Sequence, residues 1–181
     1  MNRFDDLASL DLRSLSEVLA THAPAVPGLG RGQWLGVVEL MTMRLTDECG
    51  SLSAESWATC ASALAYALEA AVASGAISRS ESVIRRLNLS VALLERVPPN
   101  PEVDILNPGH LIDLLFQELP MSAEEARDWS VDWRGLDISQ IRLLRLAKNL
   151  VSPALRLVKM APGGEFDGRL KAWGEVFRSL P

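Results

Sequence analysis

The chain has 181 residues, of which 48% are hydrophobic and 23% charged, and its formal net charge is −5. This length and composition are typical of a globular protein that forms its core without a disulfide or a metal, and they exclude a largely disordered chain. The first residues are acidic and polar rather than basic and apolar, so we expect no targeting segment, two free cysteines and a cytoplasmic protein.

Apolar residues recur with helical spacing along the chain, whereas the alternation that is typical of strands is almost absent. Capping residues, glycines and prolines indicate where each helix begins and ends. The helices expected in chain order cover about 12–21, 33–48, Ser53 to Gly75, Ser78 to the prolines at 98 and 99, the stretch after Asn107, 122–129, 138–160 and 165–179. We therefore predict an all-α fold, a compact bundle of about six to eight helices in a single domain of residues 1–181.

Local signals refine these helices. Ser78 with Glu81, and Ser122 with Glu125, have the spacing of a capping box, in which the serine accepts a backbone hydrogen bond and the glutamate reaches back to the cap. Pro153 lies inside the longest expected helix and has no N–H to donate, so we predict a kink or break near residues 150–152.

The proline-rich stretch 97–108 is the best candidate for an internal boundary. Prolines forbid the preceding helix from continuing there. The stretch is short, however, so it also suits a crossover loop within one domain.

The residues that catalysis or metal binding would need are scattered. On a helix, His110 and Asp113 share a polar side with Gln117, opposite the apolar stripe. The other histidine is His22, and no zinc, EF-hand, P-loop or nucleophile-elbow motif occurs. We therefore predict a solvent-facing His110, no cofactor and no metal.

The cysteines and the glycine-rich run do not indicate a reactive thiol or a phosphate-binding site. Cys60 borders an apolar stripe, so we expect it to be buried as a small hydrophobic residue. Cys49 stands beside Asp47 and Glu48, whose charges disfavour a thiolate. The run Gly28–Gly32 precedes a helix and resembles a phosphate-binding loop only weakly, because the P-loop lysine is missing, so we interpret it as a connector.

Charge is distributed unevenly along the chain. Residues 1–137 carry 20 acidic and 10 basic side chains, whereas residues 138–181 carry 3 acidic and 8 basic ones. On the long helix a basic stripe covers about one third of the circumference without an acid, and it consists of Arg142, Arg145, Lys148, Arg156 and Lys159. The stripe either faces solvent, docks on the acidic part of the same chain or binds a charged partner.

A second candidate contact region lies just before the long helix. Trp129 and Trp133 are four residues apart, each follows an aspartate, and both stand between helices. These side chains either cap the core or anchor an interface, where tryptophan is over-represented.

These features favour a non-enzymatic cytosolic protein-binding module, such as an immunity or antitoxin-type inhibitor or an adaptor, which acts by charge-steered association. The partner would be another protein with an acidic surface. The candidate contacts are Trp129, Trp133, Arg142, Arg145, Lys148, Arg156 and Lys159.

Two alternatives stay open. One is a helical enzyme or small-ligand binder with a pocket between helices, and the other is nucleic-acid binding through 138–160, which the overall acidity disfavours. A homo-oligomer is compatible with the sequence. No membrane partner is expected, because the most apolar stretch, 58–77, is rich in alanine and carries Glu69. The preference for arginine over lysine suggests GC-rich coding and a bacterial source.

Overall fold

In the computed structural model, residues 3–21, 29–160 and 168–179 are described, and their regular elements are all helical. These ranges contain nine α-helices: α1 (Arg3–Ser9), α2 (Leu12–Thr21), α3 (Arg31–Glu48), α4 (Ala54–Ala73), α5 (Arg79–Leu94), α6 (Pro108–Glu118), α7 (Ala123–Val131), α8 (Ile138–Met160) and α9 (Gly168–Ser179). Three short 3-10 turns join some of them: η2 (Cys49–Ser51), η3 (Asp104–Leu106) and η4 (Trp133–Gly135). Since the described ranges hold no strand, the predicted all-α fold is confirmed.

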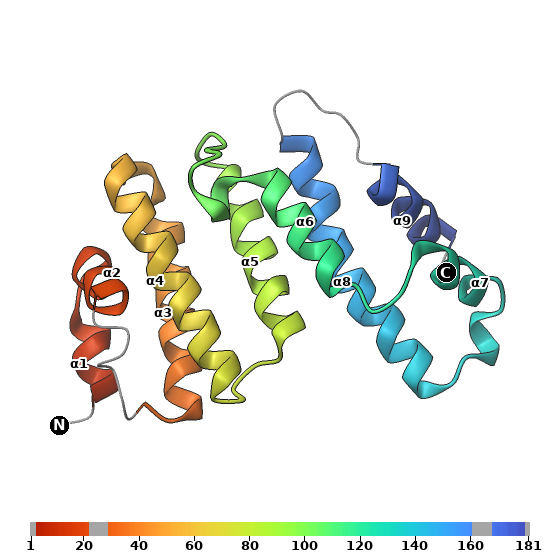
Figure 1. Cartoon of the computed structure of the whole chain (residues 1–181), viewed down its shortest axis with the longest axis horizontal. Helices are drawn as coiled ribbons and strands as arrows, with labels where there is room; N and C mark the ends of the chain where they lie inside the picture. Colours follow the sequence, from red (N-terminus) through yellow and green to blue (C-terminus); the bar gives the residue numbers. More distant parts are fainter. Residues whose placement is uncertain (1–2, 22–28, 161–167, 180–181) are drawn as a thin grey trace.

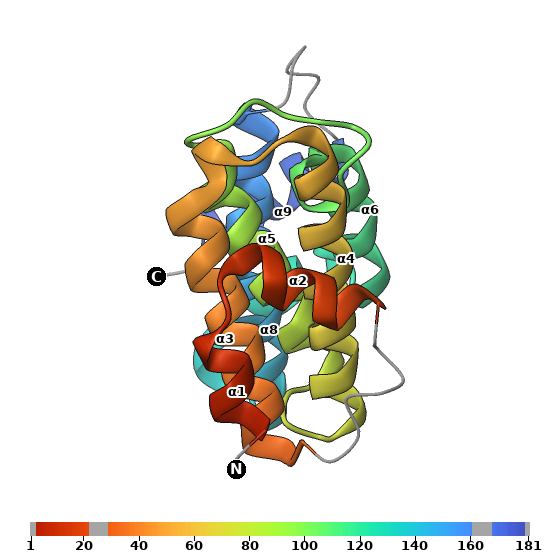
Figure 2. The same cartoon turned by 90° about the vertical axis from the view of Figure 1, so that its left-hand side faces the viewer.

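The helices pack in two layers along the longest axis of the molecule (Figures 1 and 2). In one layer α3, α5 and α8 run in the same direction, and in the other α4 and α6 run in the opposite direction. Helices α1 and α2 cover one end of the row, and α7 with α9 closes the other end. Because α8 packs against α5, α6 and α9, its remaining side is left free of other described helices.

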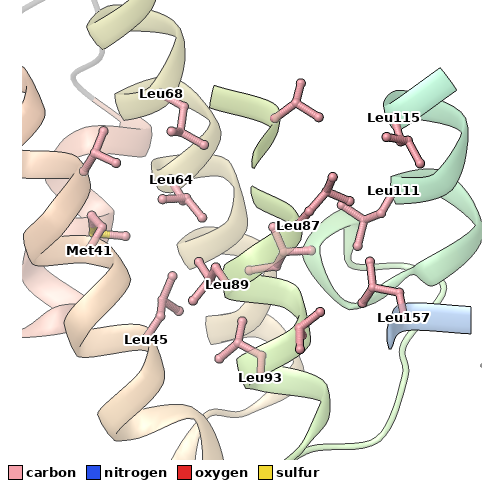
Figure 3. Close-up of a cluster of buried hydrophobic side chains, with 14 of the residues drawn as sticks. Met41, Leu45, Leu64, Leu68, Leu87, Leu89, Leu93, Leu111, Leu115 and Leu157 are labelled. Carbon is pink, nitrogen blue, oxygen red and sulfur yellow. The ribbon is translucent and has the colours of Figure 1, made fainter. Parts of the chain in front are cut away.

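The core runs through the row as a chain of buried leucines (Figure 3). Helix α5 lies at its centre, with Leu89 directed toward Leu45 of α3 and Leu87 directed toward Leu111 of α6. Each leucine that leaves water in this way contributes about 1.5–3 kcal/mol to folding. The apolar sides that helical spacing predicted are therefore the ones that join the layers.

The boundary between α4 and α5 follows the predicted signals with one difference. Gly75 has a φ of +71°, the left-handed conformation that ends a helix and that glycine adopts without strain. The Ser78 hydroxyl accepts a hydrogen bond from the Glu81 backbone N–H at 3.1 Å, as a cap should. The predicted return bond is not made, because the Glu81 carboxylate accepts from the Arg85 guanidinium one turn later.

Helix α1 was not predicted, and tertiary packing accounts for it. Its seven residues are too few for a helix that is stable in isolation. Phe4 lies against α3 at Gly36, where a Cβ would stand 2.8 Å from the Phe4 ring. The close approach that this glycine allows holds α1 on the fold. At the other end, α9 begins at Gly168, and the predicted start at 165 lies outside the described residues.

The predicted break near residues 150–152 is wrong, whereas a kink there stays a prediction. Helix α8 continues through this proline for 23 residues in all, with Pro153 itself buried. A proline inside a helix costs about 3 kcal/mol, since one hydrogen bond is lost and the ring crowds the preceding turn. Leu150 and Leu157 are fully buried on either side of it, and burial of such residues offsets that local cost.

The proline-rich stretch 97–108 folds onto the core as a crossover loop. Val103, Ile105 and Leu106 are buried there, and η3 contacts both α5 and α6. The division of the chain into one or two domains stays a prediction. None of the described helices combines the length and the apolar character that crossing a bilayer requires.

Candidate protein-interaction surface

Helix α8 positions the basic stripe. Its first turn is closed by a reciprocal pair: the Asp137 carboxylate accepts from the Gln140 N–H at 2.9 Å, and the Gln140 side-chain oxygen accepts from the Asp137 N–H at 3.0 Å. Because the helix is unbroken, residues spaced by three or four stay on one side over about 25 Å. All five members of the stripe are exposed on that side: Arg142, Arg145, Lys148, Arg156 and Lys159.

The stripe is almost unpaired within the fold. Arg156 forms an ion pair with Glu95, at the end of α5. The other four cations of the stripe make no ion pair with any described residue. The interpretation that the stripe docks on the acidic part of the chain therefore holds for Arg156 alone.

The two tryptophans have different environments. Trp129, on α7, is half-buried and packs against the core. Trp133, in η4, is 44% exposed, and the Arg134 guanidinium lies 5.6 Å from the centre of its ring. The structure therefore presents Trp133 to solvent and uses Trp129 as part of the core margin.

Sequence reasoning missed three exposed apolar side chains that lie within ten residues of Trp133 in the chain. Val131 is 84% exposed, Ile138 is 70% exposed, and Leu143 is also exposed. One signal was available, because Ile138 precedes Arg142 and Arg145 by four and seven residues and so shares their side of the helix. We call the set formed by the stripe and the apolar residues at its start the α8 surface: Val131, Trp133, Ile138, Arg142, Arg145 and Lys148.

Helix α7 anchors the tryptophan end of the α8 surface. Its predicted capping box is complete: the Ser122 hydroxyl accepts from the Glu125 N–H, and the Glu125 carboxylate accepts from the Ser122 N–H at 2.8 Å. The backbone and side-chain hydrogen bonds from Ser122 lower the pKa of Glu125 below its ordinary value of 4.5. Arg127 reaches Glu175 of α9 at 3.8 Å, so an ion pair joins the middle of α7 to α9.

The histidine and its neighbour do not form a reactive pair. His110 is exposed in the first turn of α6, as predicted. Asp113 is directed to α9, where its carboxylate lies 3.4 Å from the Arg169 guanidinium, rather than paired with His110. Among the described residues, no three histidine, cysteine, aspartate or glutamate side chains come together as metal ligands. His22 lies outside the described residues.

Neither cysteine is arranged as a nucleophile. Both are buried and free. Burial raises the pKa of the Cys60 thiol, although the Ser16 hydroxyl donates to its sulfur at 3.3 Å. The Cys49 thiol donates to the Thr46 carbonyl oxygen. In the glycine run, the Gly30 N–H donates to the Gln33 side chain and serves as the cap of α3, while Gly28 lies outside the described residues.

Three pockets or grooves are candidate sites for the small ligand of the alternative function. A polar one of about 190 Å³ lies around Ser16 and Cys60. A mainly apolar groove of about 430 Å³ separates α6 and α7 from α9, and its one cation, Arg169, stacks on Phe116 with 4.1 Å between guanidinium and ring. A second apolar groove of about 400 Å³ lies between α3 and α5. His110 lines none of these three.

Comparisons of the chain with protein-family models, with curated proteins and with solved structures find no match. The function has to be argued from the surfaces themselves.

Proposed function

We propose that the chain is a non-enzymatic cytosolic protein-binding module that holds an acidic partner protein on the α8 surface, in the manner of an immunity or antitoxin-type inhibitor or an adaptor. One observation carries the proposal. Four of the five large hydrophobic side chains exposed among the described residues fall within the stretch from Val131 to Leu143, and one of them, Ile138, shares its side of α8 with cations that make no ion pair with the described residues.

The chemistry of the α8 surface supports this role. Exposed apolar side chains that gather in one place typically mark an interaction site. Arginine and tryptophan are the residue types that most often dominate binding energy, and Trp133, Arg142 and Arg145 supply both. Unpaired cations attract an acidic partner and accelerate its association, while the apolar anchors slow its dissociation. Trp129 and Arg156 already make contacts within the chain and contribute less.

The test compares partner capture by four immobilised proteins: the wild type, Arg142→Glu/Arg145→Glu, Trp133→Ala, and Arg31→Glu/Lys171→Glu as the matched control for the double variant. Arg31 and Lys171 are exposed and lie on α3 and α9, so the control carries the same change in net charge away from the α8 surface. We expect a protein from a nuclease-treated extract of the source cells to be retained by wild type and control at about 0.1 M salt, where Coulomb forces act over about 10 Å. Arg142→Glu/Arg145→Glu and Trp133→Ala should each fail to retain that protein. Retention by all four proteins would contradict the proposal.

The basic stripe also favours one second candidate, a nucleic acid. Phosphate contacts would make such binding strongly dependent on salt. Gel-shift measurements with labelled duplex DNA and RNA at low salt separate the two candidates. Binding by the wild type that Arg142→Glu/Arg145→Glu abolishes would assign the stripe to nucleic acid and not to a protein.

A further inference from the structure

The groove between α3 and α5 is the second place where the fold exposes apolar surface. Met43 is the one large hydrophobic residue exposed among the described residues outside the stretch 131–143, and it stands in the wall of this groove with 55% of its area exposed. Leu89 and Ala92 form the wall on α5. Methionine is flexible and polarizable, which suits it to contact with varied apolar side chains.

Most polar groups of this groove are already engaged. The Thr42 hydroxyl donates to the Val38 carbonyl at 2.8 Å, and the Thr46 hydroxyl donates to the Thr42 carbonyl at 2.8 Å. Both threonines therefore have their hydroxyl groups occupied within their own helix. The Arg85 guanidinium is held by the Glu81 carboxylate at 3.1 Å. An occupant consequently finds mainly apolar contact there, together with the exposed Asn88 amide, for which the described residues supply no hydrogen-bond partner.

The groove and the basic stripe lie on one face of the molecule. Arg85 approaches Glu39 of α3 at 4.0 Å, and Glu95 pairs with Arg156 of α8, so the exposed side of α5 lies between the two. Because α5 and α8 run in the same direction (Figure 1), the groove residues 85–92 stand level with about 146–153 of α8. Lys148 lies within that span, and Arg145 lies one residue before it.

We propose that the groove receives a large apolar side chain of the same acidic partner whose carboxylates bind the α8 surface, an inference that rests on the proposed function. Neighbouring packed helices have axes about 8–10 Å apart, so the centre of the groove lies about 12–15 Å from the α8 axis. The partner chemistry that fits is an acidic segment with one bulky apolar residue at that distance from its carboxylates. Apolar burial in the groove supplies affinity, and the charges set the position of the segment.

Two fluorescein-labelled peptides test this chemistry without knowledge of the natural partner. The first has one tryptophan, a three-residue glycine and serine spacer and four glutamates, since four extended residues span about 13–14 Å. The second has serine in place of the tryptophan. Fluorescence anisotropy at low salt gives the affinity of each peptide for the wild type, Met43→Asn, Met121→Asn and Arg145→Glu/Lys148→Glu. Met121 lines the α6–α7–α9 groove, so Met121→Asn is the matched control.

We expect the tryptophan peptide to bind the wild type and Met121→Asn about tenfold more tightly than the serine peptide, which corresponds to about 1.4 kcal/mol. Met43→Asn should abolish that difference while binding the serine peptide normally, and Arg145→Glu/Lys148→Glu should weaken both peptides. Equal affinity of the two peptides for the wild type, or loss of the difference in Met121→Asn instead, overturns the groove assignment and leaves the proposed function standing. Absence of binding by either peptide overturns both.

Discussion

Helices α5 and α8 lie in the same layer, run in the same direction and pack against each other. They differ in how many of their cations form ion pairs with the described residues. On α5, two of three cations are paired: Arg79 with Glu118 of α6 at 2.6 Å, and Arg85 with Glu81, whereas Arg86 makes no ion pair with a described residue. On α8, Arg156 alone has a carboxylate partner among the described residues. Exposed ion pairs contribute about 0–1 kcal/mol each, so the fold does not depend on either arrangement. The cations of α8 are thus available for contacts outside the chain.

The largest expected effect on the free energy of unfolding concerns the buried leucines that α5 and α8 both contribute to the core. Leu87 of α5 and Leu157 of α8 are fully buried, and truncation of such leucines leaves cavities that cost about 2–5 kcal/mol. We expect Leu87→Ala and Leu157→Ala each to lower the free energy of unfolding in urea by that amount. Leu143→Ala, at an exposed position of α8, should cost less than about 1 kcal/mol. Equal effects of Leu143→Ala and Leu157→Ala would show that α8 is not packed as described.

A smaller effect is expected for the one ion pair that links the helices. A double-mutant cycle on Arg156→Ala and Glu95→Ala should give a coupling of about 0.2–1 kcal/mol, because both groups are largely exposed. The same cycle on Arg145→Ala and Glu95→Ala should give no coupling. A coupling of similar size in the second cycle would mean that Arg145 also has a partner within the fold.

Replacement of a single arginine by a neutral residue should change the free energy of unfolding in opposite directions on the two helices. Arg142, Arg145 and Lys148 are spaced by three residues, and like charges at this spacing destabilise a helix by about 0.2–0.5 kcal/mol. We therefore expect Arg145→Gln to raise the free energy of unfolding slightly and 0.5 M salt to remove the gain. Arg85→Gln should lower the free energy of unfolding, since its ion pair is lost. Destabilisation by both variants would remove the distinction between the two helices.

The smallest expected effect is the pH dependence of the free energy of unfolding that Glu125 of α7 causes. The pKa of Glu125 is lower in the folded protein than its ordinary value of 4.5, with the hydrogen bonds from Ser122 as the main cause. A lowered folded-state pKa contributes stability that is fully present above about pH 4.5 and is lost as pH falls through the folded-state value. The free energy of unfolding of Glu125→Gln should therefore lie below that of the wild type at pH 6 and meet it near pH 2–3. A constant gap over this range would contradict the role of the carboxylate.

Much of the fold could be predicted from particular residues. Helical spacing of leucines, the serine caps and Gly75 located eight of the nine described helices. The exposed side of α8 followed from the same spacing, because the period of an α-helix determines which side chains share a face. Three features could not be predicted: α1, the continuity of α8 through Pro153 and the exposure of Val131. Each depends on which other helix lies nearby, and spacing along one helix contains no such information.

The sequence by itself determined where helices form and which of their sides are apolar, since backbone geometry and local capping act over a few residues. Only the tertiary structure decided which charges are neutralised and which hydrophobic residues stay in water. It pairs Arg85 with Glu81 and Arg156 with Glu95, supplies no carboxylate for Arg142 and Arg145 from the described residues, and places Met43 in a groove on the same face. Those outcomes depend on contacts between residues far apart in the chain, because a charge or an apolar side chain acts on whatever lies within a few ångströms of it in space.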